Sequence, residues 1–75
     1  MKKPKNIITM SYESFAYHLN CNNLQLLTFQ SKFQLLTEVL KSIAKEMNKN
    51  KHNESVVPLM VDECVIEIFN KFKRS

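Results

Sequence analysis

Glycine and tryptophan are absent from the 75-residue sequence, and arginine occurs once, at position 74. Phosphate-binding loops of the Walker and Rossmann kinds require glycine where the backbone approaches the phosphate, so the sequence excludes both. The tight turns of β-sheet proteins also rely on glycine, which argues against an all-β fold. With a single arginine, the chain has almost none of the planar, forked side chains that read base edges in DNA.

Long apolar runs and paired cysteines are missing as well. The first five residues, Met-Lys-Lys-Pro-Lys, resemble the charged start of a signal peptide, but only Ile7 and Ile8 follow as an apolar segment. No run approaches the roughly 20 apolar residues that span a bilayer. Cys21 and Cys64 stand alone, as is typical of a reducing compartment. We therefore expect a cytoplasmic protein without a membrane-spanning segment.

The composition is that of a small globular protein. Hydrophobic residues make up 44% and charged residues 24% of a chain long enough for one domain, and the formal net charge is +4. We expect residues 1–9, with Lys2, Lys3 and Lys5, to form a flexible basic N-terminal arm, and residues 10–75 to form a single helical domain. Abundant lysine and asparagine beside scarce alanine indicate an AT-rich gene, and so a bacterial or phage source.

A first helix is predicted from Ser11, a suitable N-cap residue, to about Leu19. Its apolar residues recur at i, i+3, i+4 and i+7, which places them on one face: Tyr12, Phe15, Ala16 and Leu19. The asparagine-rich segment 20–23 should end this helix, because asparagine tolerates the left-handed backbone conformation that glycine would otherwise supply.

The second helix gives the strongest signal in the sequence and is predicted over about residues 24–48. Apolar residues follow an alternating spacing of three and four, which is a heptad seam: Leu26, Phe29, Phe33, Leu36, Leu40, Ile43 and Met47. Leu35 and Val39 lie beside this seam and widen the apolar arc to nearly half of the circumference. Such a wide arc needs more than one neighbouring helix.

A third helix should follow the polar connector 48–54, with Ser55 as its cap and Pro58 in its first turn, where no amide hydrogen is needed. Its predicted inner face consists of Val57, Val61, Cys64, Val65, Ile68 and Phe72. These elements predict an all-α fold, a small three-helix domain with one long central helix, and a dimeric helical bundle as its assembly.

The reactive side chains form no recognisable catalytic pattern. His18 and His52 are not accompanied by a nucleophile and an orienting acid at known spacing, and Asp62 and Glu63 are expected on a solvated face. His18, Cys21, His52 and Cys64 supply the four ligand types of a zinc site, but a buried Cys64 and a loop Cys21 explain them better. We therefore predict a protein without catalysis, metal or cofactor.

The distribution of apolar residues points instead to association with protein. Leu59 and Ile66 stand one heptad apart on the outer face of the third helix, and Leu35 and Val39 form a lateral pair on the second. The sequence therefore predicts a small regulatory protein that occludes a partner's surface, as a homodimer, through these four residues. Lys41 and Lys45 would provide charges at the rim, and Leu36, Leu40, Val61 and Ile68 would form the core.

Nucleic-acid binding is the alternative function. Lys41, Lys45 and Lys49 form an exposed row on the second helix, which suits contact with phosphates without sequence selectivity. This alternative would make the chain a small basic accessory or transcription-regulating protein.

Overall fold

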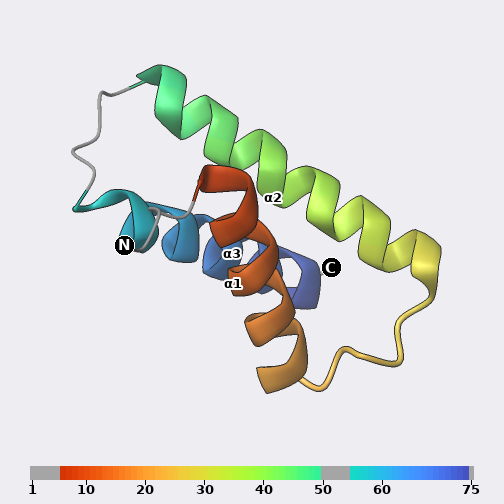
Figure 1. Ribbon diagram of the computed structural model, residues 1–75. Helices are drawn as coiled ribbons and strands as arrows, with labels where there is room; N and C mark the ends of the chain where they lie inside the picture. Colours follow the sequence, from red (N-terminus) through yellow and green to blue (C-terminus); the bar gives the residue numbers. More distant parts are fainter. Residues whose placement is uncertain (1–5, 50–54, 75) are drawn as a thin grey trace.

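The computed structural model describes residues 6–49 and 55–74, and these form three α-helices: α1 (Ile7–Cys21), α2 (Phe29–Lys49) and α3 (Val57–Arg74). The described residues contain no β-strand. Helices α2 and α3 run in opposite directions, and α1 crosses α3 (Figure 1). Helix α3 contacts both other helices more extensively than these contact each other. The all-α fold with a long second helix is confirmed for the described residues, but the prediction that this long helix is the central one is wrong, because α3 holds that position.

Helix α1 begins earlier than the sequence analysis predicts. The Asn6 side chain caps it by accepting a hydrogen bond of 2.8 Å from the backbone of Thr9. Residues 7–9, assigned by sequence to the basic arm, therefore belong to the helix, whereas residues 1–5 of that arm lie outside the described residues. Ser11 is fully buried, and its hydroxyl donates to the Ile7 carbonyl at 2.7 Å. The buried hydroxyl thus has its hydrogen-bond partner in the backbone of the same helix, and Ser11 is an interior residue of α1 and not its N-cap.

The buried face of α1 also differs from the predicted one. Phe15 and Ser11 are buried, but Tyr12 and Ala16 are exposed. The buried face therefore contains the small Ser11 in place of the predicted Tyr12. Phe15 packs edge-to-face on Phe69 of α3, with ring centroids 5.5 Å apart.

The end of α1 follows the asparagine signal in the sequence. Asn23 has a φ of 57°, in the left-handed region. Its backbone N–H donates to the Asn20 carbonyl at 3.1 Å, and the N–H of Leu24 donates to the Leu19 carbonyl at 2.9 Å. These two bonds form a Schellman motif, in which leucines at both ends of the longer bond pack against the core.

Helix α2 starts at Phe29, later than predicted, and Ile43 is the one member of the predicted seam that is fully buried in the core. Thr28 Oγ1 accepts from the backbone of Ser31 at 3.1 Å, which is the geometry of an N-cap. The exposed members of the seam are Leu26, Phe29, Phe33 and Met47. Leu36 is partly buried and packs against the core, and Leu40 is partly buried, so neither lies in the fully buried core to which the sequence analysis assigned it.

The core side of α2 is a straight row at i, i+4 and i+8, namely Leu35, Val39 and Ile43. Val39 is 0% exposed. The main neighbour of α2 is the antiparallel α3. It selects one such row of side chains, because helices pack with the ridge of one in the groove of the other. Leu35 and Val39 therefore stabilise the fold and do not form the exposed pair that the sequence analysis assigned to an interface.

Helix α3 is the centre of the domain. Its buried residues are Val57, Met60, Val61, Cys64, Val65, Ile68 and Phe69. Five of the six predicted inner residues are confirmed, Met60 and Phe69 are additions, and Phe72 stays at the edge. Pro58 lies in the first turn, as predicted. This helix is buried over a wide arc because α1 and α2 pack on different sides of it.

Candidate interaction surfaces

A polar cluster joins α1 to α3. Ser14 Oγ donates to Asp62 Oδ1 at 2.8 Å, and His18 Nε2 lies 2.7 Å from the same oxygen. Because a carboxylate only accepts, the Nε2 atom carries the proton in this bond. The His18 ring also meets the edge of Phe69, with centroids 6.3 Å apart. Asp62, predicted on a solvated face, thus fixes the crossing of the two helices.

The protein environment shifts the pKa of Asp62 in two opposing directions. Partial burial alone would raise the pKa of this carboxyl group, but the hydrogen bonds from His18 and Ser14, together with the electrostatic interaction with His18, lower it below its usual value. The ionised form is therefore favoured in the folded protein.

Lowering the pH should remove the contribution of Asp62 to stability. A carboxyl group with a depressed folded pKa stabilises the fold above its unfolded pKa of about 3.9 and loses this effect as the pH falls through the folded value. We expect Asp62→Asn to lower the unfolding free energy at pH 7 by roughly 0.5–1 kcal/mol, since the pair is partly exposed. The difference from wild type should shrink as the pH falls through the folded pKa of Asp62, which lies below its usual value. Urea titrations at pH 7, 5, 3 and 2 measure it, with Glu63→Gln as the control; a difference that did not shrink between pH 5 and pH 2 would contradict the assignment.

The cluster does not have the geometry of a nucleophilic site. Ser14 and His18 both bind the same oxygen of Asp62, so the histidine stands beside the acid and does not link the acid to the hydroxyl. Burial raises the pKa of the Cys64 thiol against the opposing hydrogen bond from Ser42, and a hydrogen bond with Cys21 raises the pKa of Tyr17. Both groups are therefore protonated at neutral pH and poorly nucleophilic.

The candidate zinc ligands are not brought together by the fold as far as it is described. Cys21 is exposed and Cys64 is buried, while His52 lies outside the described residues. Within residues 6–49 and 55–74, no three histidine, cysteine or acidic side chains are grouped closely enough to hold a metal ion.

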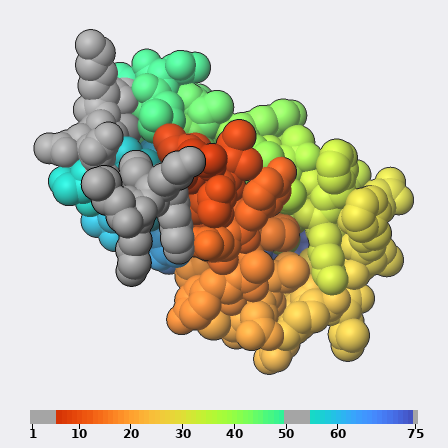
Figure 2. Space-filling view, viewed as in Figure 1, coloured from red at the N-terminus to blue at the C-terminus, as the bar shows by residue number. Residues whose placement is uncertain are grey.

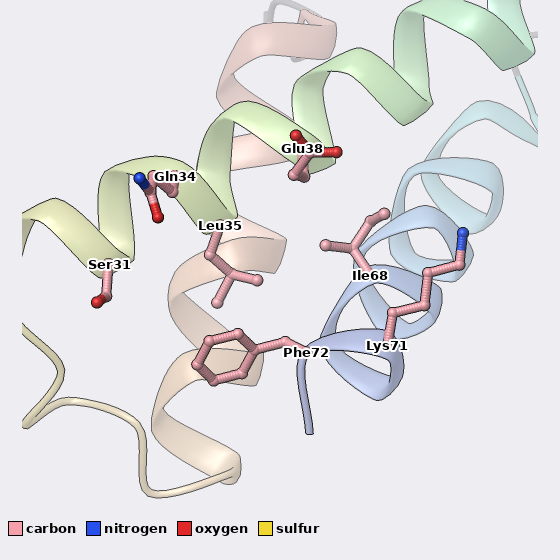
Figure 3. A pocket seen from close by; sticks show the side chains of 7 residues that line it. All are labelled: Ser31, Gln34, Leu35, Glu38, Ile68, Lys71 and Phe72. Carbon is pink, nitrogen blue, oxygen red and sulfur yellow. The ribbon is translucent and has the colours of Figure 1, made fainter. Parts of the chain in front are cut away.

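An open groove of about 310 Å³ lies between α2 and α3. Figure 3 shows its apolar side chains, Leu35 from α2 and Ile68 and Phe72 from α3, facing one another across the space between the helices. Glu38 and Lys71 lie on its two sides. Leu35 thus has a second role as part of the groove lining, although it is almost completely buried.

The outer face of α3 carries the two predicted interface residues that remain accessible. Leu59 is 61% exposed and Ile66 is 39% exposed, and Val56, three residues before Leu59, is exposed as well. Leu59 and Ile66 lie opposite the buried side of α3, and Val56 directly precedes the helix. These three residues are here called the α3 outer face. The structure therefore separates the four predicted interface residues into two that are buried and two that are exposed.

The three lysines of the predicted row are all exposed on α2. Lys41 lies 4.0 Å from Glu38, a weak, solvent-exposed ion pair. The lysines are on a different helix from Leu59 and Ile66.

A further apolar surface lies at the start of α2. Leu26 is 97% exposed, Phe29 83% and Phe33 60%, and the two phenylalanine rings stack with centroids 6.4 Å apart. Figure 2 shows this region, in yellow, at the edge of the molecule. Single exposed apolar residues are common on protein surfaces, whereas contiguous apolar patches are not.

Comparison of the chain with family models, with curated proteins and with solved structures gives no match. Among the described residues, no helix combines the length and the apolar character needed to cross a membrane.

Sequence analysis missed the cluster of Ser14, His18 and Asp62. A signal for it was present: Ser14 and His18 are four residues apart and flank Phe15, so they share the side of α1 that is buried. Their partner on α3 could not be identified, because the crossing of α1 and α3 brings together residues separated by 44 and 48 positions.

Proposed function

We propose that this chain is a non-catalytic interaction protein, which acts as a homodimer by binding a protein partner and occluding the surface it covers. The observation that carries the proposal is the α3 outer face, where apolar residues remain exposed although the helix has a complete buried side. The hydrophobic effect favours burial of such a face against a partner, because removing apolar area from water stabilises association.

The chemistry of the polar residues supports a binding role over catalysis. The hydrogen bonds from Ser14 and His18 both end on one oxygen of Asp62, where they hold α1 on α3. The groove between α2 and α3 has an apolar lining and charged residues at its sides, a form that suits one side chain of a partner.

Nucleic-acid binding remains the second candidate, and the exposed lysine row on α2 favours it. Such binding would weaken steeply with added salt, because each phosphate contact releases counterions. Binding through the α3 outer face would depend far less on salt.

One set of variants separates the two functions. Extracts of the source organism are passed over immobilised wild type, Leu59→Asp/Ile66→Asp, and Lys41→Ala/Lys45→Ala/Lys49→Ala. We expect the apolar double variant to bind its specific protein partner at least ~30-fold more weakly than wild type does. Central apolar contacts of an interface contribute about 2 kcal/mol or more, which corresponds to this change in the dissociation constant. The lysine variant should retain it, and cross-links identified by mass spectrometry should map to α3.

Asn70→Asp/Lys73→Gln is the matched control, because it changes the net charge by the same two units on the exposed surface of α3 without removing an apolar side chain. Binding of a 20-base-pair DNA duplex, measured by fluorescence anisotropy at 50 and 200 mM salt, tests the alternative. A salt-sensitive interaction that only the lysine variant loses would replace occlusion with nucleic-acid binding as the function.

A further inference from the structure

Helix α2 carries an apolar stripe that the fold of one chain does not fully cover. We define the α2 stripe as Phe29, Phe33, Leu36, Thr37, Leu40, Ala44 and Met47. None of these residues is charged, and none is completely buried. At 3.6 residues per turn they fall within an arc of about 100°. The stripe lies beside the core row of Leu35, Val39 and Ile43, and it includes most of the predicted heptad seam.

The spacing of the stripe is the same in both directions along the helix. From Phe29 to Ala44 the intervals are four, three, one, three and four residues. Turning the helix end over end therefore places each stripe position from Phe29 to Ala44 on another stripe position, whereas Met47 falls on position 26, just before the helix. A contact between two copies related by a two-fold axis requires this property, because the same surface has to fit itself.

The sizes of the side chains are complementary in this arrangement. Phe29 would lie opposite Ala44 of the second copy, Phe33 opposite Leu40, and Leu36 opposite Thr37, so the most exposed ring meets the smallest side chain. The Thr37 hydroxyl already donates to the Phe33 carbonyl at 2.8 Å, so covering it leaves no donor without a partner. Met47 would lie opposite Leu26, which is 97% exposed just before the helix.

The accessible area is that of a weak, reversible dimer. The exposed fractions of Leu26, Phe29, Phe33 and Met47 are 97, 83, 60 and 40%. Because a fully exposed large side chain has an accessible area of about 200 Å², these four side chains together expose on the order of 550 Å² in each copy. Two copies would bury on the order of 1,100 Å², just below the range of stable complexes. We therefore expect a dimer dissociation constant in the micromolar range.

We infer that the occupant of the α2 stripe is a second copy of this chain, with the two α2 helices antiparallel and the two-fold axis between Leu36 and Thr37. The inference rests on the homodimer of the proposed function and assigns its face. It leaves the α3 outer face of both copies free, so self-association and partner binding use different helices.

A charge in the stripe should separate the copies without unfolding them. Phe33 is more than half exposed, so Phe33→Glu is expected to retain the far-UV circular dichroism of wild type. Its dimer dissociation constant, from sedimentation equilibrium between about 5 and 500 μM, should rise at least ~100-fold, as for a central aromatic contact. Gln34→Glu, which adds the same charge outside the stripe, is the control and should dimerise like wild type.

Cysteine cross-linking determines the orientation, in a background where the exposed Cys21 is replaced by serine. Two Thr37→Cys residues would be offset by only about 1.5 Å along the antiparallel pair, whereas two Ala44→Cys residues would be about 22 Å apart. We therefore expect a disulfide dimer for Thr37→Cys and none for Ala44→Cys. A mixture of Phe29→Cys with Ala44→Cys chains should form the mixed dimer.

Each outcome has a separate meaning. Efficient Ala44→Cys dimers would establish parallel helices and overturn the antiparallel arrangement. A dimer unaffected by Phe33→Glu would overturn the α2 stripe as its face but leave the homodimer of the proposed function intact. A wild-type monomer at 500 μM would overturn both the stripe dimer and that homodimer, while partner binding through the α3 outer face is measured independently.

Discussion

Replacing Val39 by aspartate is expected to prevent folding. Val39 is 0% exposed and lies at the centre of the core row of α2, between Leu35 and Ile43. A carboxylate at this position would lose its hydration without gaining a partner, at a cost of at least about 4 kcal/mol. A domain of 75 residues has roughly 4–11 kcal/mol of total stability, so most or all of it would be lost.

The matched comparison for this variant is Leu59→Asp. Leu59 was assigned to the same predicted interface by sequence, but it is 61% exposed. We expect Leu59→Asp to change the unfolding free energy by less than about 1 kcal/mol, as is usual for an exposed position. Circular dichroism and urea titration of both variants provide the measurement. If Val39→Asp folded as stably as Leu59→Asp, the assignment of Val39 to the core would be wrong.

Truncating Phe69 to alanine should have the second largest effect. The ring is almost completely buried in α3, where it contacts Phe15 edge-to-face and lies against the His18 ring. Removing a buried phenylalanine leaves a cavity and costs about 3–5 kcal/mol. The variant should also weaken the packing of α1 on α3, because Phe69 provides an apolar contact between these two helices and the Asp62 cluster provides the polar one.

Phe29→Ala is the control for Phe69→Ala, since the chemical change is identical and Phe29 is 83% exposed. Both are compared by urea titration in the Phe33→Glu background, so that self-association does not contribute to the measured stability. We expect Phe29→Ala to change the unfolding free energy by less than about 1 kcal/mol. Equal losses in the two variants would show that the exposed and buried phenylalanines had been assigned incorrectly.

Helix α3 was predictable because its sequence contains one dominant signal. Pro58 fixes its first turn, and five of the apolar residues between Val57 and Ile68 recur on one side: Val57, Val61, Cys64, Val65 and Ile68. The additional burial of Met60 and Phe69 depends on a second neighbour, and the sequence of a helix does not specify how many helices will contact it. For α1, two residues suit the N-cap position, Asn6 and Ser11. In the structure Asn6 is the cap, and the apolar residues Ile7 and Ile8 that follow it already belong to the helix.

For α2, the sequence contains two overlapping apolar patterns, and only the tertiary structure distinguishes them. The heptad seam is longer and more regular, but α3 packs on the shorter row of Leu35, Val39 and Ile43. Periodicity predicts that an apolar face exists, whereas packing against a specific neighbour decides which part of it is buried. The two predicted interface residues on α2 are therefore core, and the two on α3 are exposed.

The sequence by itself determined the all-α class, the three helices, the asparagine-based end of α1 and most of the inner face of α3, because these depend on local spacing, capping and turn chemistry. The tertiary structure alone decided which row of α2 is buried, and it brought Ser14 and His18 to Asp62. Both results follow from the angle and position at which helices cross. These are set by the fit of side chains from distant parts of the chain, which no local pattern encodes.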